Sequence, residues 1–450
     1  MKDVSTRPLL SLFDLTMIVV SLVIGMGIFR TPHDVAHAAG NPYIFFGAWI
    51  FGGIIALFGA LTFAEIGSRY PVTGGFYKIY SYCYHPAIAF MINCIILISN
   101  AASVSAVALI GSGYLQGILP VEYQTQLFKQ GVALAAVIVF FFVNYLGFKM
   151  SVRTQNFLMM AKMAILLFIC LGVFAGGSEQ IPLAEAVTDE VMNPMDYIRA
   201  FGVAMIAVSF SFGGYQQTIN FGGEVKNAQK IIPKAIFIGI TIIVGFYLLV
   251  NFSYFKVLGF DGIQLSKNDL AARHAQQMIG GYAYQVMSFL LFFSVLGYVN
   301  IGLMSNPRAM YAMAEDKVLP ASLMRMNNKQ VLTVSLPVFA AVAVLTLIFA
   351  TEFEKILDRV IFLDSIGLAT AVGSIFILRR KTKHLDESGA SIYKMKWYPL
   401  MPLVYIAAYL FVSVSILIKD PGAGLIGLVL LAIFFILYLV TKNRKKPVPK

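Results

Sequence analysis

Two glycine pairs interrupt long apolar stretches of the sequence and could place free backbone groups inside a membrane. The first pair is Gly25 and Gly27, and the second is Gly213 and Gly214. If a helix unwinds at such glycines, N–H groups at the start of the next half-helix can bind an anion, and the last carbonyl groups before the break can bind a cation. One molecule with a carboxylate and an ammonium group on the same carbon, an amino acid, would use both.

Close helix packing is the alternative explanation for these glycines. Glycine lets two helix backbones approach within a membrane, so one such motif alone favours packing. Two motifs at corresponding positions in the chain favour broken helices at a binding site instead. Gln216 and Gln217 follow the second pair directly and add polar side chains there.

One basic residue lies in the middle of an apolar stretch. Lys162 is too far from the start of its stretch for its side chain to reach the headgroup region, a distance of roughly 10 Å. A cation at the bilayer centre costs at least about 2.5–3.5 kcal/mol, so such a residue suggests a function. We expect Lys162 to face the interior of the helix bundle, where it could exchange a proton.

The composition indicates that a membrane surrounds these elements. Of the 450 residues, 59% are hydrophobic and 12% are charged, whereas soluble proteins have roughly 45–50% and about 25%. The net charge of +12 is distributed in short clusters between apolar stretches, as in the loops of a membrane protein, so we expect membrane lipid and no nucleic acid as a partner. No nucleotide-binding or catalytic motif occurs, and we expect no enzyme activity.

Twelve apolar runs are long enough to span a bilayer, which needs about 20 residues. The glycine pairs lie in the first and sixth runs, and a repeat of five helices inverts its second copy in the membrane. We expect an all-α polytopic membrane protein with inverted repeats at 1–176 and 177–380, then two helices and a basic tail at 381–450. Most of the 34 Lys and Arg residues then fall on the side of both termini, which predicts cytoplasmic termini. The runs are 11–38, 43–67, 87–115, 128–148, 155–176, 196–221, 233–256, 280–313, 333–350, 356–378, 398–418 and 423–441.

Other polar residues in or near these runs suggest weaker hypotheses. Asp364 could be a structural partner or part of a gate, while Glu65 and Glu224 are expected in ion pairs. His33 and His37 are four residues apart, but no third ligand is evident and we expect no metal site. Hydrogen bonds between helices are the expected role of three further residues: Asn100, Ser103 and Asn300.

Four segments of the chain follow one another as they do in a known family. Residues 25–29 (Gly-Met-Gly-Ile-Phe) are similar to the Gly-Ser-Gly-Ile-Phe of its first helix, and residues 210–215 resemble the Phe-Ala-Tyr-Gly-Gly-Trp of its sixth. Residues 70–77 and 308–320 resemble the segments after its second and eighth helices. By this resemblance the chain is identified as a member of the amino acid–polyamine–organocation permeases, in the L-amino-acid-transporter-like branch.

The resemblance implies the leucine-transporter fold, with five plus five inverted helices and two more, in a secondary active transporter of the plasma membrane that works by alternating access. N–H groups near Met26 and Gly27 would hold the substrate carboxylate. Carbonyl groups of Val23, Phe210 and Gly213 would hold its ammonium group, and the Phe210 side chain would be the gate. The substrate-binding residues implied in this way are Val23, Gly25, Met26, Gly27, Phe210, Ser211, Gly213 and Gly214.

The resemblance also bears on coupling and partners. Lys162 matches the family's fifth-helix lysine, which fills the space of a sodium ion in sodium-coupled relatives, so no sodium is expected. No other cofactor is implied; protons are the candidate coupling ion, and exchange and proton symport both stay open. The loop between the third and fourth helices contains no cysteine, so no disulfide-linked heavy chain is expected.

Departures from the family pattern concern the substrate. Met26 stands where serine is usual, which removes a hydroxyl group from the carboxylate site, and Tyr215 to Gln217 differ from the common Trp-Asn. No acidic residue lies beside Gly25 and Gly27 in the sequence, so we expect neutral amino acids rather than arginine or polyamines. The alternative function is an amino acid sensor that binds without transporting.

Overall fold

The computed structural model describes residues 10–25, 27–174, 193–266, 269–349, 353–387 and 391–443. Over these ranges the chain is helical, and its only β contacts are isolated bridges such as Leu10 with Val225 and Thr73 with Phe221. The predicted all-α class is therefore confirmed for the described chain.

Ten spans in the described ranges are long and apolar enough to cross a membrane. Two further helices have an apolar part that is shorter than in these ten spans: α12 (Ser335–Phe349) and α16 (Pro421–Asn443). Each of the twelve predicted runs overlaps one of these elements. The long spans are α1 (Leu12–Val23) with α2 (Gly27–Ala39), α3 (Pro42–Arg69), α5 (Pro86–Gln116), α6 (Gln126–Leu146), α7 (Phe148–Cys170), α8 (Pro194–Phe212), α9 (Ala228–Leu265), α11 (Ala283–Glu315), α13 (Phe353–Lys381) and α15 (Leu400–Lys419).

Local signals explain where several of these helices begin. Asn41 caps α3, because its side-chain oxygen accepts a hydrogen bond from the Ile44 N–H at 2.9 Å, and proline occupies the first turn. Thr125 caps α6 by accepting from the Phe128 N–H at 3.2 Å. The ends of these helices are thus specified by residues next to the apolar runs.

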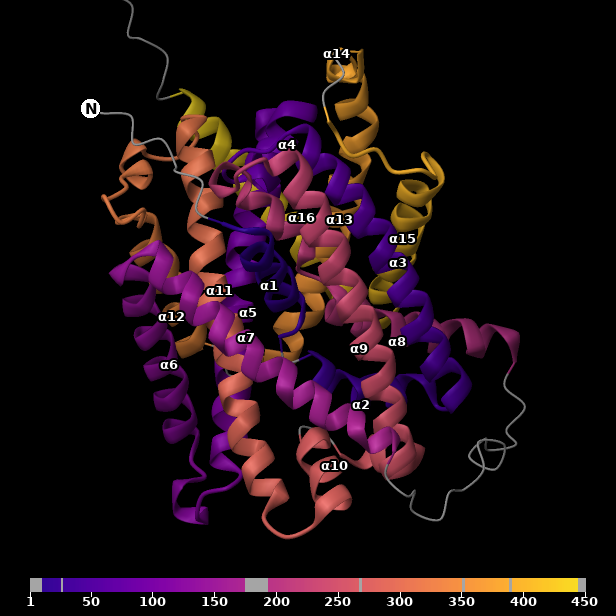
Figure 1. Ribbon diagram of the computed structural model, residues 1–450. Coiled ribbons are helices and arrows are strands. Elements are labelled where there is room, and N and C mark those ends of the chain that lie inside the picture. The colour runs from indigo at the N-terminus through magenta and orange to yellow at the C-terminus, as the bar shows by residue number, and fades with distance from the viewer. Residues whose placement is uncertain are drawn as a thin grey trace, which may run out of the picture.

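Short helices cover the two ends of the bundle. The helices α4 (Gly75–Cys83) and α14 (Lys383–Glu387) lie at one end, and α10 (Leu270–Ile279) lies at the opposite end (Figure 1). Between them α1 packs against α9, α2 against α8, α5 against α11, and α13 against α15. Small residues allow the closest of these contacts, since Gly302 of α11 faces Val104 of α5.

Buried ion pairs stabilise the end that carries α4 and α14. The Glu65 carboxylate is fully buried, and it accepts hydrogen bonds from Arg69 Nε at 2.7 Å and from Arg379 Nη2 at 2.7 Å. Glu224 pairs with Arg308 Nε at 2.9 Å. The predicted ion pairs of Glu65 and Glu224 are therefore confirmed.

The two histidines of α2 attach this helix to the end of α9. A ring nitrogen of His33 forms a hydrogen bond with the Ile263 carbonyl at 3.2 Å, and His37 does so with the Gln264 carbonyl at 2.8 Å. Within the described chain, no group of three His, Cys, Asp or Glu residues is placed to hold a metal ion. The positions of His33 and His37 agree with a structural role.

Candidate functional site

The first membrane span is broken at the predicted glycines. The helix α1 ends at Val23 and α2 begins at Gly27, with Ile24 at non-helical angles (φ −76°, ψ 78°) between them. The Gly25 N–H donates to the Val23 carbonyl at 2.7 Å, which turns the chain tightly. N–H groups in the first turn of α2 have no acceptor within the helix and can bind an anion. Met26, predicted to bind the carboxylate, lies outside the described residues.

The sixth predicted run is broken in a similar way. The helix α8 ends at Phe212, Gly213 is extended (φ −70°, ψ 157°), and Gly214 has a φ of +119° that side chains rarely adopt. The 3-10 helix η3 (Tyr215–Asn220) follows. A Cβ atom on Gly214 would overlap the Leu22 carbonyl of α1. The glycine pairs therefore break the helices and also pack them closely, so both interpretations of the motif apply.

The two breaks contact each other. A Cβ atom on Gly27 would lie 3.3 Å from the Cα of Ser211 in α8. Tyr247 of α9 connects the breaks, because its hydroxyl group donates to the Ser211 carbonyl at 3.0 Å and lies 3.4 Å from the Val23 carbonyl. No sequence pattern indicates this role for Tyr247, because tyrosine is common in apolar helices and its partners are backbone atoms of distant helices.

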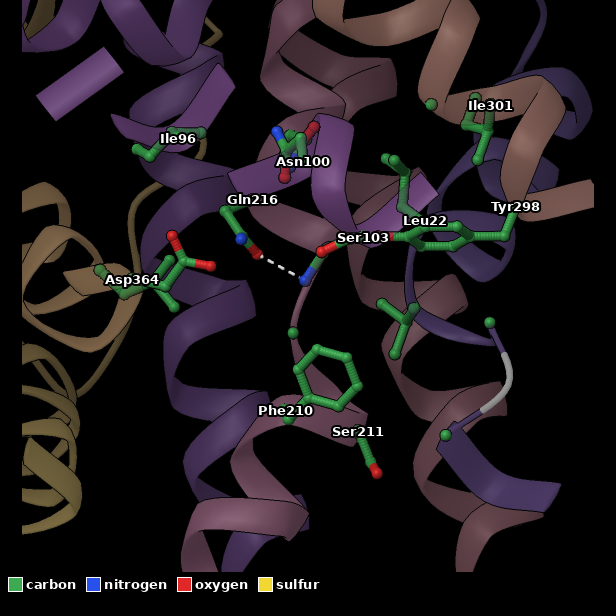
Figure 2. Close-up of a pocket in the computed structure, with 18 of the residues that line it drawn as sticks. Leu22, Ile96, Asn100, Ser103, Phe210, Ser211, Gln216, Tyr298, Ile301 and Asp364 are labelled. Carbon is green, nitrogen blue, oxygen red and sulfur yellow. Dashed lines mark hydrogen bonds between the residues drawn. The ribbon is translucent and has the colours of Figure 1, made fainter. Parts of the chain in front are cut away.

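A cavity of about 110 Å³ opens at this meeting point. This volume is several times the ~10–15 Å³ that one buried water requires. The Phe210 ring projects into the cavity (Figure 2). All predicted substrate-binding residues in the described chain line this cavity: Val23, Gly25, Gly27, Phe210, Ser211, Gly213 and Gly214.

Amide side chains form a polar wall on the other side of the cavity. Gln217 Nε2 donates to Asn100 Oδ1 at 3.1 Å, and Asn100 Nδ2 donates to Asn306 Oδ1 at 2.6 Å, which joins η3, α5 and α11. Gln216 accepts from the Gly214 N–H at 2.9 Å, the dashed line in Figure 2. The predicted hydrogen bond between helices is confirmed for Asn100, which also faces the cavity.

Lys162 lies behind the first break and does not line the cavity. Its side chain is fully buried in α7, and its ammonium nitrogen donates to the Ile24 carbonyl between α1 and α2. The prediction that Lys162 faces the bundle interior is confirmed. The hydrogen bond to Ile24 connects Lys162 to the backbone of the first break, and the neighbours of Ile24 line the cavity.

A buried amide network lies near Lys162. Asn300 Nδ2 donates to Gln155 Oε1 at 2.6 Å and accepts from Asn144 Nδ2 at 2.9 Å. Gln155 in turn donates to the hydroxyl group of Ser21 in α1. Asn300 thus forms the predicted bonds between helices, and it lies outside the cavity.

Asp364 of α13 lines the same cavity as Gly25 and Gly27. Ser99 Oγ of α5 donates to its Oδ2 at 3.1 Å. The expectation that no acidic residue lies near the glycine site is therefore wrong. It relied on neighbours in the sequence, whereas the fold brings α13 to the cavity from the second half of the chain.

Comparison with known proteins assigns the family. The sequence model of the amino acid permease family matches residues 10–444. The chain belongs to the amino acid permease family. It is therefore an amino acid transporter of the membrane and not an enzyme, and the sensor alternative has no support.

Named relatives align with this permease along nearly all of its length. The serine/threonine exchanger SteT of Bacillus subtilis (strain 168) is 29% identical over 433 residues, covering 94% of this chain and 95% of the relative. The human large neutral amino acids transporter small subunit 2 is 24% identical, covering 92% and 76%. The human cystine/glutamate transporter is 26% identical, covering 92% and 81%.

Proposed function

We propose that this permease is a secondary active transporter that moves neutral amino acids across the plasma membrane by alternating access. The contact between two broken helices at a cavity is the observation that supports the proposal. Backbone N–H and carbonyl groups at such breaks can hold both charged groups of an amino acid.

The proposed roles of the site residues follow from their chemistry. N–H groups at the start of α2, near Met26 and Gly27, would hold the carboxylate. Carbonyl groups of Val23, Phe210 and Gly213 would hold the ammonium group, and the Phe210 ring would close over the substrate. The Val23 and Phe210 carbonyl groups already accept from Gly25 and Gly213 N–H groups, so they would share their lone pairs with the substrate.

The proposed coupling residue is Lys162. Its ammonium group donates to the Ile24 carbonyl, and a fixed cation at this break leaves no need for sodium there. Two modes of coupling are proposed, exchange of one amino acid for another and symport with protons. The name of the Bacillus relative, a serine/threonine exchanger, supports exchange.

The proposed topology has twelve spans in two inverted repeats of five plus two additional helices, with both termini in the cytoplasm. Two observations support it: the broken spans are five apart in order, and basic residues such as Lys78, Lys383 and Arg379 gather at the end that carries α4 and α14. We also propose that transport requires no disulfide-linked heavy chain.

Uptake into proteoliposomes tests this function. The purified chain is reconstituted alone, and uptake of labelled amino acids is measured with and without internal amino acid and with and without a pH gradient. Flux that needs internal substrate indicates exchange, and flux driven by inward protons alone indicates symport. Binding without any flux would refute transport, and a requirement for sodium would refute the role given to Lys162.

Substitution of Lys162 tests its proposed role in coupling. Lys162→Ala should reduce the uptake rate, because the Ile24 carbonyl loses its donor. It should also change the dependence of uptake on pH, because the group proposed to exchange a proton is removed. Lys129→Ala is a control on α6, where the lysine is half-buried. Unchanged rate and pH dependence in Lys162→Ala would exclude the coupling role.

A further inference from the structure

One side chain in the cavity carries a full negative charge when ionised. Asp364 extends from α13, and its carboxylate lies on the opposite side of the cavity from the Tyr298 ring (Figure 2). The same lining contains both helix breaks, and Gly25 of the first break lies against the Tyr298 ring. An amino acid held at the breaks would therefore share this cavity with Asp364, and a side chain that extends away from Tyr298 would approach the carboxylate.

The partners of Asp364 leave acceptor capacity free. Ser99 donates to Oδ2 at 3.1 Å, and in the described part of the chain no Lys or Arg forms an ion pair with Asp364. The side chain is half-buried and borders the cavity. A carboxylate has two oxygens with about four acceptor sites, so one hydrogen bond leaves most of them for a ligand.

An apolar substrate side chain would be unfavourable beside this carboxylate. It would displace water from the cavity without replacing the hydrogen bonds that the water makes, and an unsatisfied buried polar group is costly. A site built to accept a hydrogen bond also discriminates strongly against ligands that lack the donor. Three polar side chains, Asn100, Gln216 and Ser103, face the same space (Figure 2), while much of the remaining wall is apolar.

We propose that Asp364 determines substrate specificity by accepting a hydrogen bond from the substrate's side chain. The permease then favours neutral amino acids with a hydroxyl donor on the side chain over apolar amino acids of the same size. This inference depends on the proposed transport function and narrows its substrate class. Ser99 has a positioning role, because its hydrogen bond holds the carboxylate between α5 and α13.

Pairs of amino acids that differ in one hydroxyl group provide the test, and threonine and valine also match in size. Threonine and valine differ by one hydroxyl group in place of a methyl group, and serine and alanine differ by one hydroxyl group. Binding of each to the purified full chain is measured from the shift in its melting temperature with ligand concentration. Hydrogen bonds to charged groups lead us to expect that threonine binds about tenfold or more tightly than valine.

Two substitutions test whether Asp364 causes the preference for threonine over valine. Asp364→Leu should bring the threonine-to-valine ratio close to one or invert it, because the acceptor is lost. Asp364→Asn keeps a neutral acceptor, so it should lower the threonine-to-valine ratio less than Asp364→Leu does. Asp261→Asn is the matched control, since Asp261 is exposed near the end of α9 and should leave every ratio unchanged.

The outcomes are distinguishable. A ratio near one in the unmodified chain overturns the proposal without any variant, as does an unchanged ratio in Asp364→Leu. If Asp364→Asn changes only the pH dependence of uptake, Asp364 carries a proton instead and the specificity role is wrong. If no amino acid binds or is transported by the unmodified chain, the proposed function itself fails.

Discussion

Removing one hydroxyl group should loosen both helix breaks at once. Tyr247→Phe deletes the group that donates to the Ser211 carbonyl at 3.0 Å and lies 3.4 Å from the Val23 carbonyl. The ring itself should stay in place, because it packs against Trp49 and Phe212 with ring centroids 5.7 Å and 4.9 Å away. The substitution therefore isolates the hydrogen bonds that connect α1 with α8.

The expected magnitude follows from these bonds. An ordinary hydrogen bond contributes about 0.5–1.5 kcal/mol net, and a buried acceptor left without its donor costs about 1–3 kcal/mol. The Ser211 carbonyl loses its donor at normal length, while the Val23 contact is long and adds little. We expect a loss of about 1–3 kcal/mol, which corresponds to roughly 5- to 150-fold weaker substrate binding if the loss falls on the arrangement that binds.

Substrate affinity is the assay, measured by uptake at varied concentration and by the thermal shift with the same amino acid. Tyr254→Phe is a matched control on α9, because Tyr254 is fully buried and its hydroxyl group has no hydrogen-bond partner within the described chain. Equal affinities for Tyr247→Phe and the unmodified chain would refute the reasoning. An equal loss in Tyr254→Phe would show that the effect reflects burial rather than the connection between the breaks.

Three further predictions concern the glycine break and the ion pairs. Gly214→Ala should abolish uptake while the protein still inserts, because the new Cβ meets the Leu22 carbonyl at a φ of +119°; uptake is compared with the amount of protein in the vesicles. Glu65→Gln should lower the free energy of unfolding by about 3–5 kcal/mol, since it breaks a buried ion pair; thermal unfolding in detergent measures this. Burial would raise the pKa of Asp386, but hydrogen bonds from Arg69 hold this pKa below the ordinary 3.8. The ionised Asp386 carboxylate should therefore stabilise the fold at neutral pH, and this stabilisation should be lost as the pH falls below about 4. Melting curves at several pH values measure the loss.

Each of these predictions has a control. Gly213→Ala should be milder than Gly214→Ala, because φ at Gly213 is −70° and any L-residue can adopt it. Glu387→Gln should change stability little, since its ion pair with Lys383 is exposed at 3.5 Å. Asp386→Asn should remove the loss of stability at low pH. The account of the glycine break is wrong if Gly213→Ala impairs uptake as much as Gly214→Ala does. The account of the buried ion pair is wrong if Glu65→Gln leaves the free energy of unfolding unchanged. The account of Asp386 is wrong if Asp386→Asn loses stability at low pH as the unmodified chain does.

Residue type alone predicted the parts of the site that depend on backbone or charge. Gly214 had to be glycine because of its φ and its contact with α1, and a lysine within an apolar run had to face the protein interior. The φ of Gly214 and the cost of a buried charge are local constraints, so the sequence expresses them. The positions of the broken helices and of Lys162 were predictable for this reason.

Tertiary packing determined the rest of the site. Tyr247 bonds backbone atoms in helices far away in the chain, and no sequence pattern marks which tyrosine does this. Asp364 reaches the cavity because α13 lies beside it, and a search for acids next to Gly25 could not find it. Hydrogen bonds to distant backbone and contacts across the bundle leave no periodic signal in the sequence.

The backbone contact between Gly214 and Leu22 also has a mechanical consequence. Two helices that touch through side chains can shift relative to each other as rotamers change, but here no side chain stands between the Gly214 backbone and the Leu22 carbonyl. A change of side-chain rotamer therefore cannot absorb relative movement of α1 and the segment between α8 and η3 at this point. Opening either face of the bundle then either moves these two backbone segments together or separates them.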